Sequence, residues 1–143
     1  MNKLLTLIAL SAALYFGWQE LESPDNPASR SEQGNGSLQD NFDNRTSGSQ
    51  VQGSGTVIKI LPDDNDGSRH QRFILRLDSG RTLLVAHNID LAPRIASLRV
   101  GDTVAFNGEF EWNEKGGIIH WTHHDPAGRH ATGWLKHDGR RYQ

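Results

Sequence analysis

The chain has 143 residues, a formal net charge of -2 and no cysteine. This charge excludes a polycation that coats nucleic acid through its overall field, so an anionic partner would need a local group of cations. The absence of cysteine excludes disulfides, thiol catalysis and thiolate metal sites. A small domain of this kind is stabilised by its hydrophobic core or by a metal held through other ligands.

The first 18 residues predict an export signal. Lys3 precedes an apolar run from Leu4 to Trp18, which is the pattern of a signal peptide or a short signal anchor. The run is shorter than the ~20 residues that span a bilayer comfortably. We therefore expect an extracytoplasmic protein, which is periplasmic, secreted or, if the segment is retained, tethered to the inner membrane. The alternative is a buried helix of a globular domain.

Residues 19–52 are predicted to form a disordered linker. Ser, Asn, Gln, Asp and Gly dominate this segment, and aliphatic residues are scarce. Such a composition buries too little apolar surface to offset the entropy lost on ordering. The folded domain is accordingly expected over residues 53–143.

The next part of the chain predicts five strands and one short helix. β-Branched runs and alternating apolar residues indicate strands over residues 55–61, 71–77, 81–86, 103–112 and 117–122. Residues 91–98 have the spacing of a short helix, with Pro93 near its start. The helix is thus expected between the third and fourth strands.

This order of elements predicts an all-β fold, a small five-stranded OB-like barrel with one helix. Glycines in the first and fourth strands suit the sharp bends of such a barrel. An open β-sandwich is the alternative. Residues 123–143 contain one large aliphatic residue, Leu135, and are expected to wrap the barrel as an irregular, ordered extension.

Histidines gather at the end of the fifth strand and after it. Imidazole and carboxylate groups are common ligands of zinc, nickel, iron and manganese, and alternate residues of a strand share one face. The segment therefore predicts a divalent metal site, of unspecified metal, built from His120, His123, His124, Asp125 and His130. The alternative is structural: these histidines donate to backbone carbonyls and hold a loop that has few aliphatic residues.

A second set of polar residues flanks the second and third strands. Cleavage of a phosphodiester needs a base, a cation that stabilises phosphoryl charge, and an acid for the leaving oxygen. The predicted catalytic residues of this set are His70, Arg72, His87, Asn88 and Arg94. The alternative for Asn88 and its neighbour Asp90 is to cap the expected helix.

Four blocks of sequence resemble a bacterial domain-of-unknown-function family, number 3465. They are Leu61 to Phe73, Ala86 to Arg94, Gly101-Asp102, and His120 to Pro126 with the neighbouring Gly128-Arg129-His130. The resemblance covers the whole expected folded part. It implies a small exported bacterial protein and supplies no activity.

A fainter, fold-level likeness is to staphylococcal-type nucleases, which are also OB-type barrels. It rests on Gly55 to Lys59 and Ile89 to Pro93, which occur in similar order. The Asp-Gly-Asp-Thr type motif is absent after the first strand, and Arg94 stands where an acidic residue would follow the proline. A nuclease site in this chain would therefore be built from histidine.

Two functions follow from these patterns. The first is a histidine-based, metal-assisted nuclease or phosphodiesterase acting on nucleic acid. The second is a non-enzymatic, tethered binding module for an anionic or other polymer, or for an envelope protein. Convergence of His70, His87 and the histidines of residues 120–130 in one cleft would favour the enzyme.

Overall fold

The computed structural model describes residues 37–143, so the expected export signal lies outside the described residues. The strands are β1 (Ser49–Asp64), β2 (His70–Arg76), β3 (Thr82–Asn88), β4 (Thr103–Glu111), β5 (Ile118–His120), β6 (Trp134–His137) and β7 (Arg140–Tyr142). Residues 37–43 form one short helix before β1. Within this described part, no helix is both long enough and apolar enough to cross a membrane.

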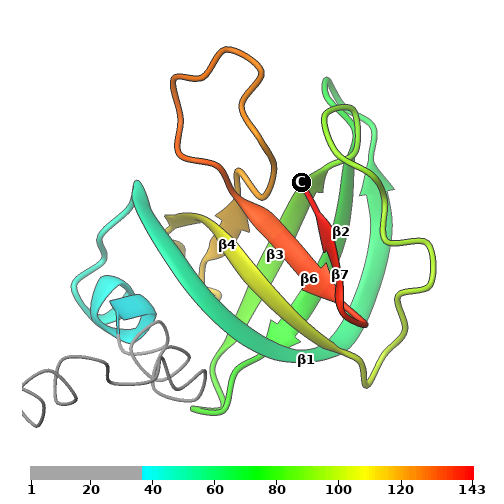
Figure 1. Ribbon diagram of the computed structural model, residues 1–143. Coiled ribbons are helices and arrows are strands. Elements are labelled where there is room, and N and C mark those ends of the chain that lie inside the picture. Colours follow the sequence, from blue (N-terminus) through cyan, green and yellow to red (C-terminus); the bar gives the residue numbers. More distant parts are fainter. Residues whose placement is uncertain (1–36) are drawn as a thin grey trace, which may run out of the picture. The chain divides into compact units, whose positions relative to one another are not determined.

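The first five strands close into a barrel, as Figure 1 shows. Their order is β1-β2-β3-β5-β4, and β4 pairs back with β1. The pairs are antiparallel except β3 with β5, which is parallel. The closed ring confirms the predicted OB-like barrel and is not the open sandwich that was its alternative.

Strand β1 closes the ring because it pairs with β4 along its first part and with β2 along the rest. Gly55 lies near this change of partner, where a Cβ atom would be 2.8 Å from the carbonyl oxygen of Arg76. Only glycine admits so close an approach of the neighbouring strand. Alternate residues then point inward to a core that includes the fully buried side chains of Val57, Phe73, Val85, Phe106 and Phe110.

The helix expected over residues 91–98 is absent, and residues 89–102 form turns and irregular chain instead. Ile95 is buried from this loop, with 1% of its surface exposed. The side chain of Gln71 accepts from the Ile95 N–H at 2.9 Å and donates to the Ile95 carbonyl at 3.0 Å. Because the buried Gln71 side chain satisfies the Ile95 N–H and carbonyl, this segment packs against the core without forming a helix.

The ordered domain begins earlier than residue 53. Residues 37–43 are helical and β1 starts at Ser49, whereas residues 19–36 of the expected linker lie outside the described part. Leu38 and Val51 are 1% and 3% exposed, and Phe42 packs against the same core. Leu38 and Phe42 are four residues apart and thus share one helix face. The polar composition concealed these few, well-placed apolar residues.

The C-terminal extension is more regular than the sequence suggests. Strand β6 pairs with β4 through Leu135 and Phe106, and β7 pairs with β6. Leu135 and Tyr142 belong to the core cluster. Between β5 and β6, residues 121–133 form a loop that projects from the barrel (the orange segment in Figure 1).

Candidate functional site

His87, one of the predicted catalytic residues, is fully buried at one end of the barrel. Its Nε2 lies 2.9 Å from the carbonyl oxygen of Pro93, and its Nδ1 lies 2.7 Å from Oγ1 of Thr122. A carbonyl only accepts, so Nε2 carries the proton and Nδ1 accepts from the threonine hydroxyl. Burial lowers the pKa of His87 from 6.5 to about 4. This imidazole is neutral, with no nitrogen free to serve as a base.

The other predicted catalytic residues also hold loops at this end. Arg72 donates from Nε and a terminal nitrogen to the carbonyl of Pro62, at 3.1 and 3.0 Å. Arg94 forms an ion pair with Asp63. The Asn88 side chain accepts from the N–H of Asp90 at 3.0 Å, and Nδ1 of His70 donates to the carbonyl of Ser68 at 2.8 Å. These contacts fasten loops to the barrel, and the catalytic role of these residues stays a prediction.

Asp125 organises loop 121–133 through its carboxylate. Its carboxylate accepts three backbone N–H bonds of 2.9 Å, from Ala127, Arg129 and His130. These bonds, led by the one from Ala127, lower the pKa of Asp125. In the structure the Asp125 oxygens thus bind the loop backbone, including the N–H of His130. The role of Asp125 as a metal ligand stays a prediction.

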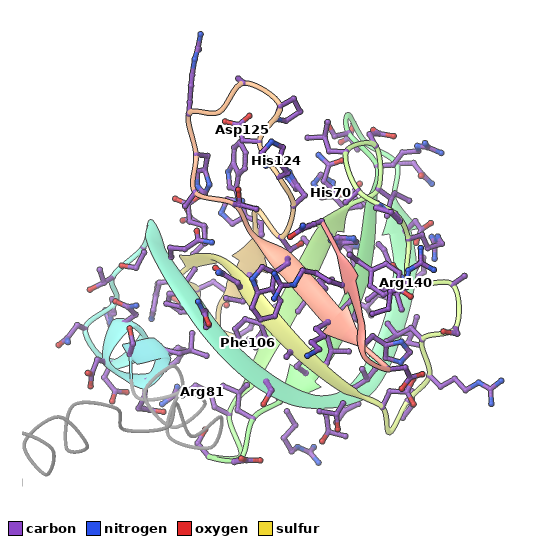
Figure 2. The ribbon with its side chains drawn as sticks, viewed as in Figure 1. His70, Arg81, Phe106, His124, Asp125 and Arg140 are labelled. Atoms are coloured by element: carbon purple, nitrogen blue, oxygen red, sulfur yellow. The ribbon has the colours of Figure 1, made fainter. Side chains whose placement is uncertain are left out.

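His123 and His124 have local partners as well. Nδ1 of His123 donates to the carbonyl of His124 at 2.8 Å, and Nδ1 of His124 lies 3.2 Å from Oγ1 of Thr132. His70, His124 and Asp125 all lie at the upper end of the view in Figure 2. His123 and His70 also contribute to the lowered pKa of His87, after the larger effect of burial. The fold thus brings several histidines to one end, where the Nδ1 atoms of His70, His123 and His124 bond to loop groups.

A different group of side chains meets on the outer face of β4 and β5. Glu109 and Glu111 are alternate residues of β4, and His120 lies opposite Glu109 in the ladder with β5. Nε2 of His120 is 3.6 Å from Oε2 of Glu109 and 3.5 Å from Oε1 of Glu111. This nitrogen is buried and makes no hydrogen bond in the described structure. The three residues place one ligand atom each within 4.8 Å of the others.

His130 joins this group from the projecting loop. Its Nε2 lies 3.3 Å from Oε2 of Glu109, the same oxygen that His120 approaches. Its Nδ1 donates to the carbonyl of Ala131 at 2.8 Å, and its ring stacks on Trp121 with centroids 4.1 Å apart and planes 8° apart. The ring is therefore held firmly in place. We call Glu109, Glu111, His120 and His130 the Glu–His cluster.

The tautomer of His130 determines whether the cluster can bind a cation. Since Nδ1 donates to a carbonyl, Nε2 of the neutral ring bears a lone pair, and that lone pair faces the Glu109 carboxylate. Two electron-rich atoms 3.3 Å apart require a positive charge between them. That charge is either a proton on Nε2 or a cation bound by both groups.

Sequence reasoning found His120 and His130 but missed the two glutamates. The signal was present in strand four, where Phe106 and Phe110 alternate with outward residues at 107, 109 and 111. Gly108 completes the arrangement, because a Cβ atom there would be 2.5 Å from the carbonyl oxygen of His120.

Comparison with known proteins gives a family but no activity. The family model described as Protein of unknown function (DUF3465) matches residues 25–143. The chain belongs to this family. No curated protein matches the chain.

Proposed function

Within this family of unknown function, we propose that the domain is a metal-binding module that holds a divalent transition-metal ion in the Glu–His cluster. The observation that carries the proposal is the pair of imidazole nitrogens, from His120 and His130, that approach one carboxylate oxygen of Glu109. The buried Nε2 of His120 has no hydrogen-bond partner in the described structure, and a cation at this oxygen would also satisfy the lone pair of His130.

The distances between the nitrogen and oxygen atoms of the cluster fit the spacing of ligands around a metal ion. Ligand atoms about 2.0–2.2 Å from a tetrahedral ion lie about 3.3–3.6 Å from one another. The nitrogen–oxygen distances in the cluster are 3.3, 3.5 and 3.6 Å. The bond from Nδ1 of His130 to a backbone carbonyl is also the usual way in which a protein orients a metal-bound imidazole.

The donor set selects the kind of ion. The three ligand atoms that lie within 4.8 Å of one another come from one imidazole and two carboxylates, and His130 adds a second imidazole beside Glu109. A set that contains imidazole suits zinc, manganese, iron or nickel, whereas calcium and magnesium prefer oxygen ligands alone. Zinc is therefore the best first probe. If the N-terminal segment exports the protein, as its pattern predicts, this binding takes place outside the cytoplasm.

Metal-assisted nuclease activity is the second candidate function. Its active site would be the Glu–His cluster and not the surroundings of His87. The side chains of His120 and Glu111 are 31% and 45% exposed, so a polymer in solution can reach an ion held there. A bound ion would supply an activated water. The residues predicted to be catalytic from the sequence would then serve only the fold.

Zinc titration of the full chain by calorimetry, in a mild detergent, tests the proposal. Glu109→Gln and His120→Ala should each weaken zinc binding by about 10- to 100-fold, as loss of a ligand or of its orientation does. Glu114→Gln, which makes the same change on an exposed residue outside the cluster, is the matched control. Zinc binding that Glu109→Gln leaves unchanged would refute the site. Cleavage of DNA and RNA by the zinc- and manganese-loaded chain tests the second candidate.

A further inference from the structure

Strands β5 and β6 lie one after the other along the same edge of β4. His120 at the end of β5 is opposite Glu109, and Trp134 at the start of β6 is opposite Asn107. Two residues further on, Lys136 is opposite Ala105. Alternate residues share a face, so the row of outward side chains passes from the Glu–His cluster to Trp134 and then to Lys136.

Two cations end this row. Lys136 and Arg141 are both exposed and lie directly opposite each other in the β6–β7 ladder. The Arg141 guanidinium lies 4.7 Å from the centre of the Trp134 ring. Like charges that face each other across a ladder destabilise it. Neither cation has an acidic partner within 4.0 Å among residues 37–143, whereas Arg69 does. A bound anion would relieve this repulsion.

Amide groups flank the row on the other side. Gln50 and Gln52 of β1 are opposite Glu109 and Asn107. Nε2 of Gln50 donates to Oδ1 of Asn107 at 2.6 Å. Among residues 37–143, the amide nitrogen of Asn107 and the oxygen of Gln50 have no partner and can bind other groups. One continuous face therefore offers amides, an indole ring and two cations.

We propose that this face binds single-stranded nucleic acid. Its outward side chains, which we call the β4–β6 face, are Gln50, Gln52, Asn107, Trp134, Lys136 and Arg141. A base stacks on Trp134, the neighbouring phosphate lies on Lys136 and Arg141, and the amides bind base edges. Along β4 the positions of Trp134 and Lys136 are two residues apart, which is about 7 Å, so one nucleotide reaches both.

A nucleic acid fits this face better than an acidic polysaccharide, because it combines a flat aromatic base with a charge on every unit. The face is also distinct from the β2–β3 surface that OB barrels commonly use. There, Arg72 is bound to the Pro62 carbonyl, and Phe73 points into the core. The inference is independent of metal binding at the neighbouring cluster.

Fluorescence anisotropy of a labelled oligothymidylate of about 15 nucleotides, near the largest site of one OB barrel, tests the inference with the full chain in EDTA. Trp134→Ala should weaken binding about tenfold, and Trp134→Phe should restore most of it. The double variant Lys136→Glu, Arg141→Glu should weaken binding at least tenfold and reduce its salt dependence. Lys59→Glu, an exposed cation where β1 pairs with β2, is the matched control and should change little.

Three results would overturn the inference. The first is no binding by the unaltered chain. The second is equal binding of heparin, a polyanion without bases, together with no effect of Trp134→Ala. The third is an equal loss on Lys59→Glu, which would show a response to net charge alone. Circular dichroism of each variant confirms that its fold is retained, and the exposed Lys136 and Arg141 variants keep the test decisive if Trp134→Ala unfolds the chain.

Discussion

His87 at the barrel end and His130 on the outer face of β4 are oriented by the same kind of hydrogen bond. They differ in the group that meets the second ring nitrogen. His87 and His130 each donate one ring N–H to a backbone carbonyl. The second nitrogen of His87 meets the Thr122 hydroxyl in a fully buried site, whereas that of His130 meets a carboxylate on a partly exposed face. The Thr122 hydroxyl can donate to His87, so that histidine is structural. The Glu109 carboxylate cannot donate to His130, so the nitrogen of His130 remains able to bind a cation.

The largest effect should come from removing the buried histidine. His87→Ala leaves a cavity, and the Thr122 hydroxyl and Pro93 carbonyl lose their partner, so we expect the free energy of unfolding to fall by about 3 kcal/mol. Urea denaturation measures this loss. His124→Ala, on the exposed loop, should change it by less than about 1 kcal/mol. Equal losses of unfolding free energy in His87→Ala and His124→Ala would contradict the difference between the buried site and the exposed loop.

The pH dependence of stability should follow the same residue. The pKa of His87 is about 4 in the folded chain, below its ordinary 6.5. Between these values the unfolded chain binds a proton that the folded chain excludes, so stability is complete above 6.5 and is lost as the pH falls towards 4. The full loss is up to about 3 kcal/mol.

Unfolding in urea at several pH values between 7 and 4 tests this slope, and His87→Gln should flatten it. The acidic groups with lowered pKa values act mainly below about pH 5, so the slope between pH 7 and 5 belongs chiefly to His87. Asp90, Asp102 and Asp125 are all shifted downward from 3.8, so their contributions are lost at lower pH. A slope that persists in His87→Gln would assign the effect to another group.

On the outer face, His130→Ala should weaken zinc binding about tenfold, which corresponds to about 1.4 kcal/mol, because one of the cluster's imidazoles is lost. His123→Ala is the comparison, since its Nδ1 serves the His124 carbonyl and not the cluster. Calorimetric titration of both variants gives the ratio. A larger effect in His123→Ala would place the metal at the barrel end instead.

The smallest effect should come from Arg94, which the sequence suggested as a catalytic cation. It pairs with Asp63 at the surface, where the two side chains are 42% and 28% exposed. Exposed ion pairs contribute about 0–1 kcal/mol. Arg94→Ala should therefore lower the free energy of unfolding by less than about 1 kcal/mol in urea and leave zinc affinity unchanged. A loss above 2 kcal/mol would show that the loop depends on this pair.

Much of the barrel was predictable because the strands have alternating apolar residues that are visible in the local sequence. The period-two patterns of β2, β3 and β4 lie close to their observed bounds, and the glycines mark close approaches of neighbouring strands. The short helix at residues 37–43 and strands β6 and β7 were missed. Each buries very few apolar residues, and those few matter only beside a core that local patterns do not describe.

By itself, the sequence determined the strand pattern, the closed OB-like order and the unusual abundance of histidine. Tertiary structure alone decided what each histidine does. The ladder register places His120 beside Glu109. The turn held by Asp125 places His130 near Oε2 of Glu109, the oxygen that His120 also approaches. The role of an imidazole depends on which atoms meet its two nitrogens and on how much water remains, and those partners come from strands and loops far apart in the chain.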